Sequence, residues 1–358
     1  MSQDTILLIW DRIGDYHLSR VKACEKLLGA PVFTADLAGT DNLYKWDSIA
    51  KTTHTVLSSK PAEQSDIWNR FRTFRRIIKT HSIAVVAMPY GRTEYHIFLL
   101  YARLKGIRTI IFSESWYSRG KLKDFLKSLL LKSLGNYFFV SGKRAFDHFT
   151  KNYKINPEKI ETGYSVVDNN HFQRRLFTEK KYVLTIARYS EEKNLSFLID
   201  SYAKSVISNT YNLMLIGEGP LRPALQSQID ILGLSDRVQL AGWVPYAALP
   251  KAYAEAVVFV LPSSFEPWGL VVNEAMSAGL PILVSDACGC MPELVAEGVN
   301  GWSFNSNTQQ ELIERLNAFA ALSEKGIEIT GKNSMQLIRN YTPDTWAGSI
   351  ARLAQAGR

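Results

Sequence analysis

The sequence predicts an α/β protein built from two doubly wound domains, and three observations lead to this prediction. At 358 residues, the chain is longer than one ordinary hydrophobic core accommodates. Its hydrophobic share of 46% is that of a packed globular protein. Short apolar runs alternate with amphipathic stretches along its whole length, which is the pattern of parallel strands covered by helices.

Continuous apolar runs of strand length predict the sheets, because parallel strands that are buried on both faces show little alternation. In the first half, the expected strands are Ile6–Trp10, Pro31–Thr34, Ile83–Met88, Arg108–Ser113 and Tyr137–Ser141. In the second half, they are Tyr182–Ala187, Leu213–Gly217, Val238–Ala241, Val257–Leu261 and Ile282–Ser285. Helical periodicity falls between these strands, for example at Leu195–Ser205 and Pro220–Leu232.

Turn-forming residues without a clear period make Glu161–Phe172 the expected linker. We therefore expect a Rossmann-like domain over residues 1–165 and a second one over residues 166–340, facing a central cleft. Residues 341–358 contain a predicted helix that begins after Pro343 and crosses back to the first domain. Folds of this kind bind ligands beyond the carboxyl ends of their strands.

The formal net charge of +8 is unevenly distributed. Residues 1–175 carry 28 Lys and Arg against 16 Asp and Glu, whereas the remainder carries 14 against 18. Two basic stretches stand out, Arg70–Lys79 and Ser118–Gly135, and the second has leucines near helical spacing. Each stretch alone is typical of a core-facing helix with a solvated basic face. The charge of the whole half favours weak contact with an anionic membrane, or an acidic or lipid-diphosphate acceptor. Nucleic acid is not expected, because no binding motif accompanies the charge.

The compartment that the sequence favours is the cytoplasm, with peripheral attachment to the cytoplasmic face of a membrane. The apolar runs are too short to span a bilayer, and we expect no secretory leader. Three cysteines, an odd number, fit a reducing environment. Cys288 and Cys290 form a C-x-C without a second Cys or His pair, so we interpret them as small residues of a turn rather than as zinc ligands.

The segment 265–279, F-E-P-W-G-L-V-V-N-E-A-M-S-A-G, is the strongest functional signal. It follows an expected strand and leads into a helix that begins near Gly269. Unpaired amides and the positive dipole end at a helix start suit a diphosphate, and Gly269 permits close approach of a ligand. Glu266 precedes the helix and Glu274 lies inside it, so the two carboxylates can contact different parts of one extended ligand. Either glutamate alone would more often be a solvated acid.

This string resembles the E-x7-E signature of retaining glycosyltransferases of family four, which have the GT-B fold. The resemblance is strong over residues 180–305 and looser over residues 1–175. It implies that Glu266 contacts sugar hydroxyls and that Glu274 contacts the ribose. It also implies that the donor is bound around Trp268, with backbone amides of Gly269, Leu270 and Val271 on the sugar and the phosphates.

Further segments match the same family at the expected distances. Arg188 and Lys193 resemble the basic pair that is set on the donor phosphates, where two fixed cations would stabilise a departing diphosphate. As isolated residues, both would usually be surface charges. Gly217 resembles the glycine turn near the nucleotide, and Val244 lies in the segment whose backbone contacts the base. The matches over 286–294 and at Asn300–Gly301 serve either the site or the fold alone.

In the first half, Gly14 corresponds to the family's glycine loop near the donor phosphates. Asp15 and His17 are candidate acceptor-site residues, although a histidine in this position more often packs or is solvated. Many relatives have a histidine that touches the donor sugar where this chain has Glu114. Glu114 is therefore a candidate sugar-site residue. A carboxylate in place of that histidine would contact the sugar differently.

The resemblance implies transfer of a sugar from a nucleoside-diphosphate sugar, with UDP favoured, to a glycan, lipid-linked or glycoconjugate acceptor. It implies retention by a front-face route in which the leaving phosphate helps to deprotonate the acceptor. No D-x-D motif is present, so we expect neither a metal nor another cofactor. Three alternatives are sugar-nucleotide epimerisation, glycogen-type phosphorolysis and a non-catalytic binding module. Glycosidase chemistry is a further rival for the paired acids, but the adjoining cations and helix start favour an anionic leaving group.

Overall fold

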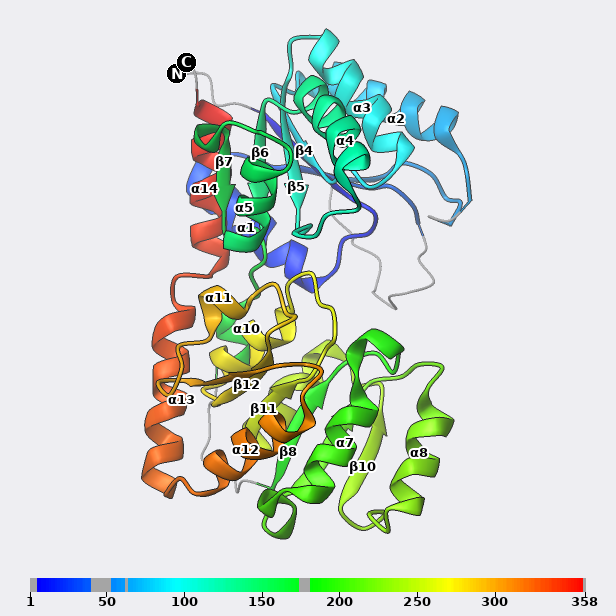
Figure 1. Ribbon diagram of the computed structural model, residues 1–358. Coiled ribbons are helices and arrows are strands. Elements are labelled where there is room, and N and C mark those ends of the chain that lie inside the picture. The colour runs from blue at the N-terminus through cyan, green and yellow to red at the C-terminus, as the bar shows by residue number, and fades with distance from the viewer. Residues whose placement is uncertain (1–4, 40–52, 62–63, 174–180, 357–358) are drawn as a thin grey trace. The chain divides into compact units, whose positions relative to one another are not determined.

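The computed structural model describes residues 5–39, 53–61, 64–173 and 181–356, which form two compact units (Figure 1). The first unit comprises residues 1–166 together with 343–358, and the second comprises residues 167–342. Each unit is a parallel sheet wrapped by helices, so the predicted α/β class with two doubly wound halves is confirmed. Among the described residues, no helix is both long enough and apolar enough to cross a membrane.

The sheet of the first unit has the strand order β3-β2-β1-β4-β5-β6-β7, with every described pairing parallel. Its strands are β1 (Ile6–Trp10), β2 (Phe33–Asp36), β3 (His54–Val56), β4 (Val85–Met88), β5 (Arg108–Ser113), β6 (Tyr137–Val140) and β7 (Ile160–Thr162). The expected linker, residues 161–172, contains the boundary between the two units at Val166 and Val167, together with most of β7 and the short helix α6 (Asn169–Phe172).

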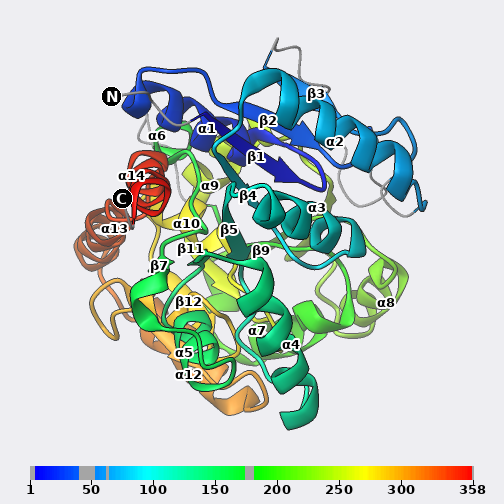
Figure 2. The same ribbon diagram turned by 90° about the horizontal axis from the view of Figure 1, so that it is seen from above.

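Helices on both faces of this sheet are α1 (Asp15–Leu28), α2 (Ile67–His81), α3 (Thr93–Leu104), α4 (Lys121–Leu134), α5 (Lys143–Lys151) and α14 (Pro343–Gln355). The last of them, α14, packs along α1 and against β5, β6 and β7 (Figure 2). Its Trp346 is fully buried, with ring centroids 5.5 Å from Phe139, 6.0 Å from Phe112 and 6.4 Å from Trp10. The C-terminal helix therefore completes the core of the first unit.

The sheet of the second unit has the order β10-β9-β8-β11-β12-β13 and is also parallel throughout its described pairings. The strands are β8 (Tyr182–Ile186), β9 (Asn212–Ile216), β10 (Val238–Gly242), β11 (Ala256–Leu261), β12 (Ile282–Ser285) and β13 (Gly301–Phe304). The helices after α6 are α7 (Leu195–Lys204), α8 (Arg222–Ile231), α9 (Leu249–Glu255), α10 (Leu270–Ser277), α11 (Met291–Leu294), α12 (Gln309–Ala320) and α13 (Glu324–Ile338).

Each sheet has a point at which the strand order reverses, and that point determines where a site can form. The reversal lies between β1 and β4 in the first sheet and between β8 and β11 in the second. The connections leaving such a pair of strands diverge to opposite faces of the sheet and leave a crevice beyond the strand ends. The segments that follow β1, β4, β8 and β11 are therefore the ones to search for chemistry.

Candidate functional site

An ion pair lies at the strand-order reversal of the second sheet. Lys193 belongs to a short 3-10 turn after β8, and Glu266 belongs to the segment after β11. The distance from Lys193 Nζ to Glu266 Oε2 is 2.5 Å, and the two side chains are only 18% and 14% exposed. Partial burial reduces screening by water and salt, so this pair is held more firmly than a typical surface pair. The structure thus brings together two of the residues that the sequence assigns to the donor site.

Both sides of the ion pair are fixed by backbone hydrogen bonds. The Glu266 N–H donates to Ala287 O at 3.2 Å, and the Gly289 N–H donates to Glu266 O at 2.9 Å, which makes a small parallel bridge with the segment after β12. On the other side, the Ser264 N–H donates to Glu192 O at 2.9 Å. The two charged side chains therefore extend from anchored backbone and lose little conformational freedom when they pair.

Helix α10 begins next to this pair, and its start depends on Gly269. Gly269 has φ 103° and ψ 64°, in the left-handed region that disfavours residues with a Cβ. A Cβ at this position would lie 2.9 Å from Leu261 Cδ2 and 3.4 Å from Glu266 Cγ. Leu270 and Val271 follow in the first turn and are partly exposed. Amides in a first helical turn have no intrahelical acceptor, so this turn is suited to an anion.

Two residues of the same segment are covered instead of exposed. Trp268 is 1% exposed, and its Nε1–H donates to Asn273 Oδ1 at 2.9 Å. Its ring therefore packs inside the unit against α10, so the part that we predict for Trp268 in donor binding would fall to its backbone. Glu274 has no exposed surface, and it accepts a hydrogen bond of 2.6 Å from the Tyr253 hydroxyl. A ligand would reach this carboxylate only if that hydrogen bond were exchanged.

The other predicted donor residues of this unit differ in their setting. Arg188 is exposed, and within the described part of the chain its guanidinium makes no hydrogen bond or ion pair. Gly217 has φ 142°, and a Cβ there would collide with the carbonyl of Ala187, so the close approach of two backbone segments explains this glycine. Val244 is partly exposed after β10, and the preceding Trp243 is 57% exposed. Sequence reasoning did not single out Trp243.

Cys288 and Cys290 are buried thiols, and burial raises the pKa of Cys290 well above its ordinary value. Cys288 Sγ lies 3.4 Å from Ser285 Oγ in the turn that bridges to Glu266. Over the ranges that the structure describes, no group of three or more His, Cys, Asp and Glu residues could hold a metal ion. The buried Asn300 donates to Leu294 O and accepts from the Ala296 N–H, which favours a structural role for that match.

In the first unit, Gly14 and His17 form the start of α1. Gly14 is the N-cap residue, and its N–H donates to His17 Nδ1 at 3.1 Å. An acceptor Nδ1 requires the neutral ring, and burial lowers the pKa of His17 well below its ordinary value, with Arg20 adding to the effect. The ring also contacts Trp10, at a centroid distance of 4.6 Å. His17 is thus a capping and packing residue here, whereas Asp15 at the first helical position is exposed.

Glu114 has a charge partner inside the first unit. Arg20 is 2% exposed, donates to Val166 O at 2.7 Å and lies over the Tyr164 ring at 5.2 Å. Burial lowers the pKa of Arg20, and the nearby Tyr164 and Glu114 partly offset this effect. Glu114 also accepts a hydrogen bond from Ser165 Oγ at 2.5 Å. The carboxylate of Glu114 therefore partly compensates the buried guanidinium of Arg20.

Sequence reasoning missed a charged cluster at the strand-order reversal of the first sheet. Asp11 follows β1, and Arg92 follows β4. Arg92 Nε donates to Asp11 Oδ2 at 2.8 Å, and the Tyr95 hydroxyl donates to Asp11 Oδ1 at 2.5 Å. The signal is a charged residue shortly after each of two apolar strands, Asp11 one residue after β1 and Arg92 four residues after β4, but the sequence does not reveal that these strands are neighbours.

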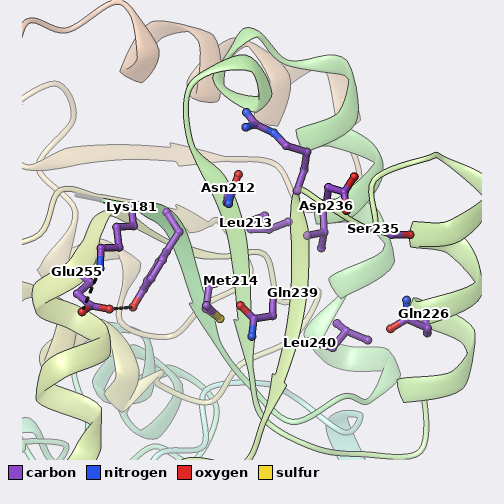
Figure 3. A pocket seen from close by; sticks show the side chains of 13 residues that line it. Lys181, Asn212, Leu213, Met214, Gln226, Ser235, Asp236, Gln239, Leu240 and Glu255 are labelled. Atoms are coloured by element: carbon purple, nitrogen blue, oxygen red, sulfur yellow. Dashed lines mark hydrogen bonds and ion pairs between the residues drawn. The ribbon is translucent and has the colours of Figure 1, made fainter. Parts of the chain in front are cut away.

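A hollow of about 580 Å³ lies away from these residues, at the amino ends of β8, β9 and β10 (Figure 3). Lys181, Tyr182 and Glu255 line one side of it and are engaged with one another. Lys181 Nζ lies 3.7 Å from Glu255 Oε1, and the Tyr182 hydroxyl donates to Glu255 Oε2 at 3.5 Å. This hollow lies at the amino edge of the sheet, whereas doubly wound sheets bind ligands at the opposite edge. We therefore place the candidate site at the carboxyl edge.

Comparison with protein families gives one match, in which residues 166–334 fit the model described as glycosyl transferases group 1. An uncharacterized glycosyltransferase of Methanocaldococcus jannaschii is 33% identical over 156 residues, which are 43% of this chain and 40% of that protein. A Campylobacter jejuni relative, named as a diphospho-undecaprenol N-acetylgalactosaminyltransferase, is 25% identical over 201 residues, or 54% of this chain and 53% of the relative. The alignments thus span about half or less of these relatives.

Among solved structures, the Anabaena protein HepE in complex with UDP is similar over 97% of this chain and 98% of its own, with a TM-score of 0.76 and 17% identity. A glycosyltransferase from Rickettsia africae covers 100% of both chains, with a TM-score of 0.78 and 13% identity. At these identities the likeness shows the fold alone. It extends over both units, so the GT-B class is confirmed.

Proposed function

We propose that this chain, whose residues 166–334 fit the model described as glycosyl transferases group 1, transfers a sugar from a nucleoside-diphosphate sugar to a glycan or lipid-linked acceptor. The observation that carries the proposal is the half-buried pair of Lys193 and Glu266, placed beside the Gly269 start of α10. A cation, a carboxylate and a helix start lie at one strand-order reversal. Each suits a group of a sugar diphosphate: the cation and the helix start suit the charged phosphates, and the carboxylate suits the sugar hydroxyls.

In the proposed transfer, the acceptor hydroxyl oxygen bonds to the anomeric carbon as the bond from that carbon to the diphosphate breaks. Both events occur on one face, so the anomeric configuration is retained. The acceptor proton passes to an oxygen of the departing diphosphate. Lys193, Arg188 and the first-turn amides of α10 stabilise the charge that develops there, and fixed donors need no reorganisation as it forms. Glu266 binds sugar hydroxyls and keeps Lys193 in place.

We propose that the nucleotide of the donor is UDP. Supporting this choice, the HepE structure, whose fold this chain shares, holds UDP. A lipid-linked saccharide is the acceptor class that we favour, because the name of the Campylobacter jejuni relative specifies a diphospho-undecaprenol carrier. The basic first half of the sequence complements such a diphosphate.

The first test is a thermal-shift and product-release experiment. Purified protein is incubated with UDP-, GDP- and ADP-sugars, and both the melting temperature and the release of nucleoside diphosphate are measured. We expect stabilisation by UDP and by a UDP-sugar, because a ligand that binds only the folded state at about 100 times its Kd adds about 2.7 kcal/mol. Indifference to every nucleotide would rule out the proposed site.

Variants of the ion pair locate the chemistry, and the chain offers a matched control. Lys193→Met and Glu266→Gln remove one charge each at the carboxyl edge of the sheet. Lys181→Met and Glu255→Gln do the same to the ion pair at the amino edge. We expect Lys193→Met and Glu266→Gln to lower kcat by about 10²–10³-fold, the range for a lost transition-state donor. We expect the control variants to keep wild-type kcat.

A purely structural role of the pair makes a different prediction. Both partners are absent from the double variant Lys193→Met/Glu266→Gln, so no charge is left unpaired. If the pair served only the fold, the double variant would recover the activity that each single variant loses. We expect it to remain inactive, because neither the cation nor the sugar-binding carboxylate is restored. Binding of UDP with no transfer to any extract-derived acceptor would instead indicate a binding module.

A further inference from the structure

Helix α4 presents an apolar ridge to solvent. Leu122, Phe125, Leu126 and Leu129 are 71%, 58%, 57% and 51% exposed, and their spacing of three, one and three residues places them on one face of the helix. We call these four side chains the α4 ridge. A helix that covers a sheet normally directs its largest apolar side chains toward that sheet. In α4, Phe125 and three leucines point outward, whereas Leu131 and Leu134 are buried.

The inward face of α4 is correspondingly polar. Asp124 and Ser128 are buried, together with Leu131 and Leu134. Asp124 accepts hydrogen bonds from Ser118 Oγ at 2.5 Å and from the Arg119 N–H at 3.4 Å, and Ser128 Oγ donates to the carbonyl of Tyr153. These contacts fix the rotation of α4 about its axis, because turning the ridge inward would expose or break them. The outward ridge is therefore an established feature of the fold.

Helix α2, the other basic stretch of the sequence, is built in the opposite way. Its apolar Phe74, Ile77 and Ile78 are buried, and its Arg70 pairs with Glu94 at 2.6 Å inside the unit. Its exposed positions include Arg76 and Lys79. Helix α2 is thus a core-facing helix with a solvated basic face. The two basic stretches look alike in the sequence, but α2 has one large exposed apolar side chain, Trp68 (79%), at its start, whereas α4 has four on one face.

The charges around the α4 ridge are of one sign. Lys121, Lys123 and Lys132 are exposed on α4, and the acidic residue of this helix, Asp124, faces inward. The packed neighbour α3 contributes exposed Arg103 and Lys105 after two exposed leucines, Leu100 (49%) and Leu104 (77%). Apolar side chains flanked by cations suit a surface that is apolar inside and anionic at its boundary.

We propose that the α4 ridge docks the protein onto an anionic lipid bilayer, with α4 lying in the plane of the headgroups. The leucines and Phe125 insert between the headgroups, and the lysines contact the lipid phosphates. A second copy of this chain fits less well, because a two-fold contact between ridges would bring the lysines of the two copies against each other. The charges of the ridge therefore select lipid over self-association.

Docking through α4 would also orient the first unit. Helix α4 begins after the segment that follows β5, at the carboxyl edge where Asp11 and Arg92 lie. That segment carries Trp116, with Arg144 4.9 Å from its ring. An acceptor that is anchored in the bilayer would therefore reach this edge without leaving the membrane.

Vesicle co-sedimentation tests the proposal, using phosphatidylcholine alone and phosphatidylcholine mixed with phosphatidylglycerol. The ridge variant is Leu126→Ser/Leu129→Ser, with Ile231→Ser as its control because Ile231 is 81% exposed on α8. The basic variant is Lys121→Glu/Lys123→Glu, with Arg76→Glu/Lys79→Glu on α2 as the charge-matched control. All of these positions are exposed, so folding is expected to survive, and the melting temperature verifies this.

We expect binding to mixed vesicles that weakens as salt rises, and little binding to phosphatidylcholine alone. The ridge variant should lose at least about tenfold in vesicle affinity, since two side chains of this size no longer leave water. The basic variant should lose a similar factor and most of its salt dependence, whereas both controls should bind like the wild type. Equal binding by the ridge variant and its control would overturn the proposal. So would dimerisation of the wild type in sedimentation velocity without vesicles, if the ridge variant abolished it.

Discussion

Replacing Gly269 by alanine is a direct test of how the candidate site is assembled. The backbone there has φ 103° and ψ 64°, and an L-residue forced into the left-handed region loses about 1–2 kcal/mol. The added methyl group would also meet Leu261 Cδ2 at 2.9 Å and Glu266 Cγ at 3.4 Å. The first contact is closer than packed carbons allow, so Leu261 or the start of α10 must move. Gly269→Ala therefore combines backbone strain with a displacement beside Glu266.

Gly233→Ala separates these two effects. Gly233 has φ 66°, but nothing lies within 4 Å of where its Cβ would be. This variant introduces strain without a collision, in the same unit and away from the ion pair. Strain of about 1 kcal/mol lowers the melting temperature of a domain of this size by about 2–4 °C. We expect Gly269→Ala to lower it by at least about twice as much, because a steric term of 1–3 kcal/mol adds to the strain.

The affinity for UDP is the second measurement. Displacing the start of α10 moves the first-turn amides and the Glu266 side chain, so titration calorimetry should show weaker UDP binding for Gly269→Ala and unchanged binding for Gly233→Ala. The reasoning fails if the two variants melt alike and bind UDP alike. That result would mean that the segment absorbs a methyl group without moving and that Gly269 does not position the site.

The remaining predictions concern the first unit. Asn can replace the His17 Nδ1 acceptor of the Gly14 N–H without titrating. In thermal scans from about pH 7 to about pH 5, the melting temperature of His17→Asn should therefore fall less than that of the wild type. The sign follows from the lowered pKa of His17. Its contribution to stability is present above the ordinary His pKa of about 6.5 and is lost as pH falls, because the unfolded chain binds a proton that the folded chain excludes. Identical pH profiles of the two proteins would contradict the capping role. Trp346→Ala should destabilise the first unit by about 3–5 kcal/mol in denaturant titrations because it leaves a cavity between α14 and the sheet, whereas Trp346→Phe should cost much less. Similar small losses for both would show that α14 does not complete this core.

The sequence predicted the central strands because these are buried on both faces and read as unbroken apolar runs. It missed β3, β7 and β13, which lie at the edges of the two sheets. These three strands have only three or four residues each, and β7 includes Glu161 and Thr162, whereas the fourth edge strand, β10, has five residues and was predicted. Without two neighbouring strands, such a segment needs no continuous apolar run. The pattern that identifies a strand therefore weakens where the pairing is one-sided.

For the candidate site, the family string 265–279 identified Glu266 and Gly269, and a separate match identified Lys193, because residues close in the sequence or at strand ends define that part. It did not distinguish side chains that point inward from those that point outward. Trp268 and Glu274 belong to the same string, yet both are buried. Their orientation depends on Asn273 and Tyr253, which no local pattern identifies. Burial is a property of the packed fold, and the spacing of residues alone does not determine it.

Both sheets have an ion pair at the point where the strand order reverses, and only the strand order shows that these pairs are equivalent. At each strand-order reversal, a carboxylate after one central strand pairs with a cation after the other: Asp11 with Arg92, and Glu266 with Lys193. The side chains of Asp11 and Arg92 are 40% and 32% exposed, whereas those of Glu266 and Lys193 are 14% and 18% exposed. Because screening by water weakens with burial, the same charges act more strongly in the second unit. The charge of a nucleoside diphosphate interacts more strongly with charged groups that are less screened by water. The difference in burial therefore supports our proposal that the donor binds at the second unit.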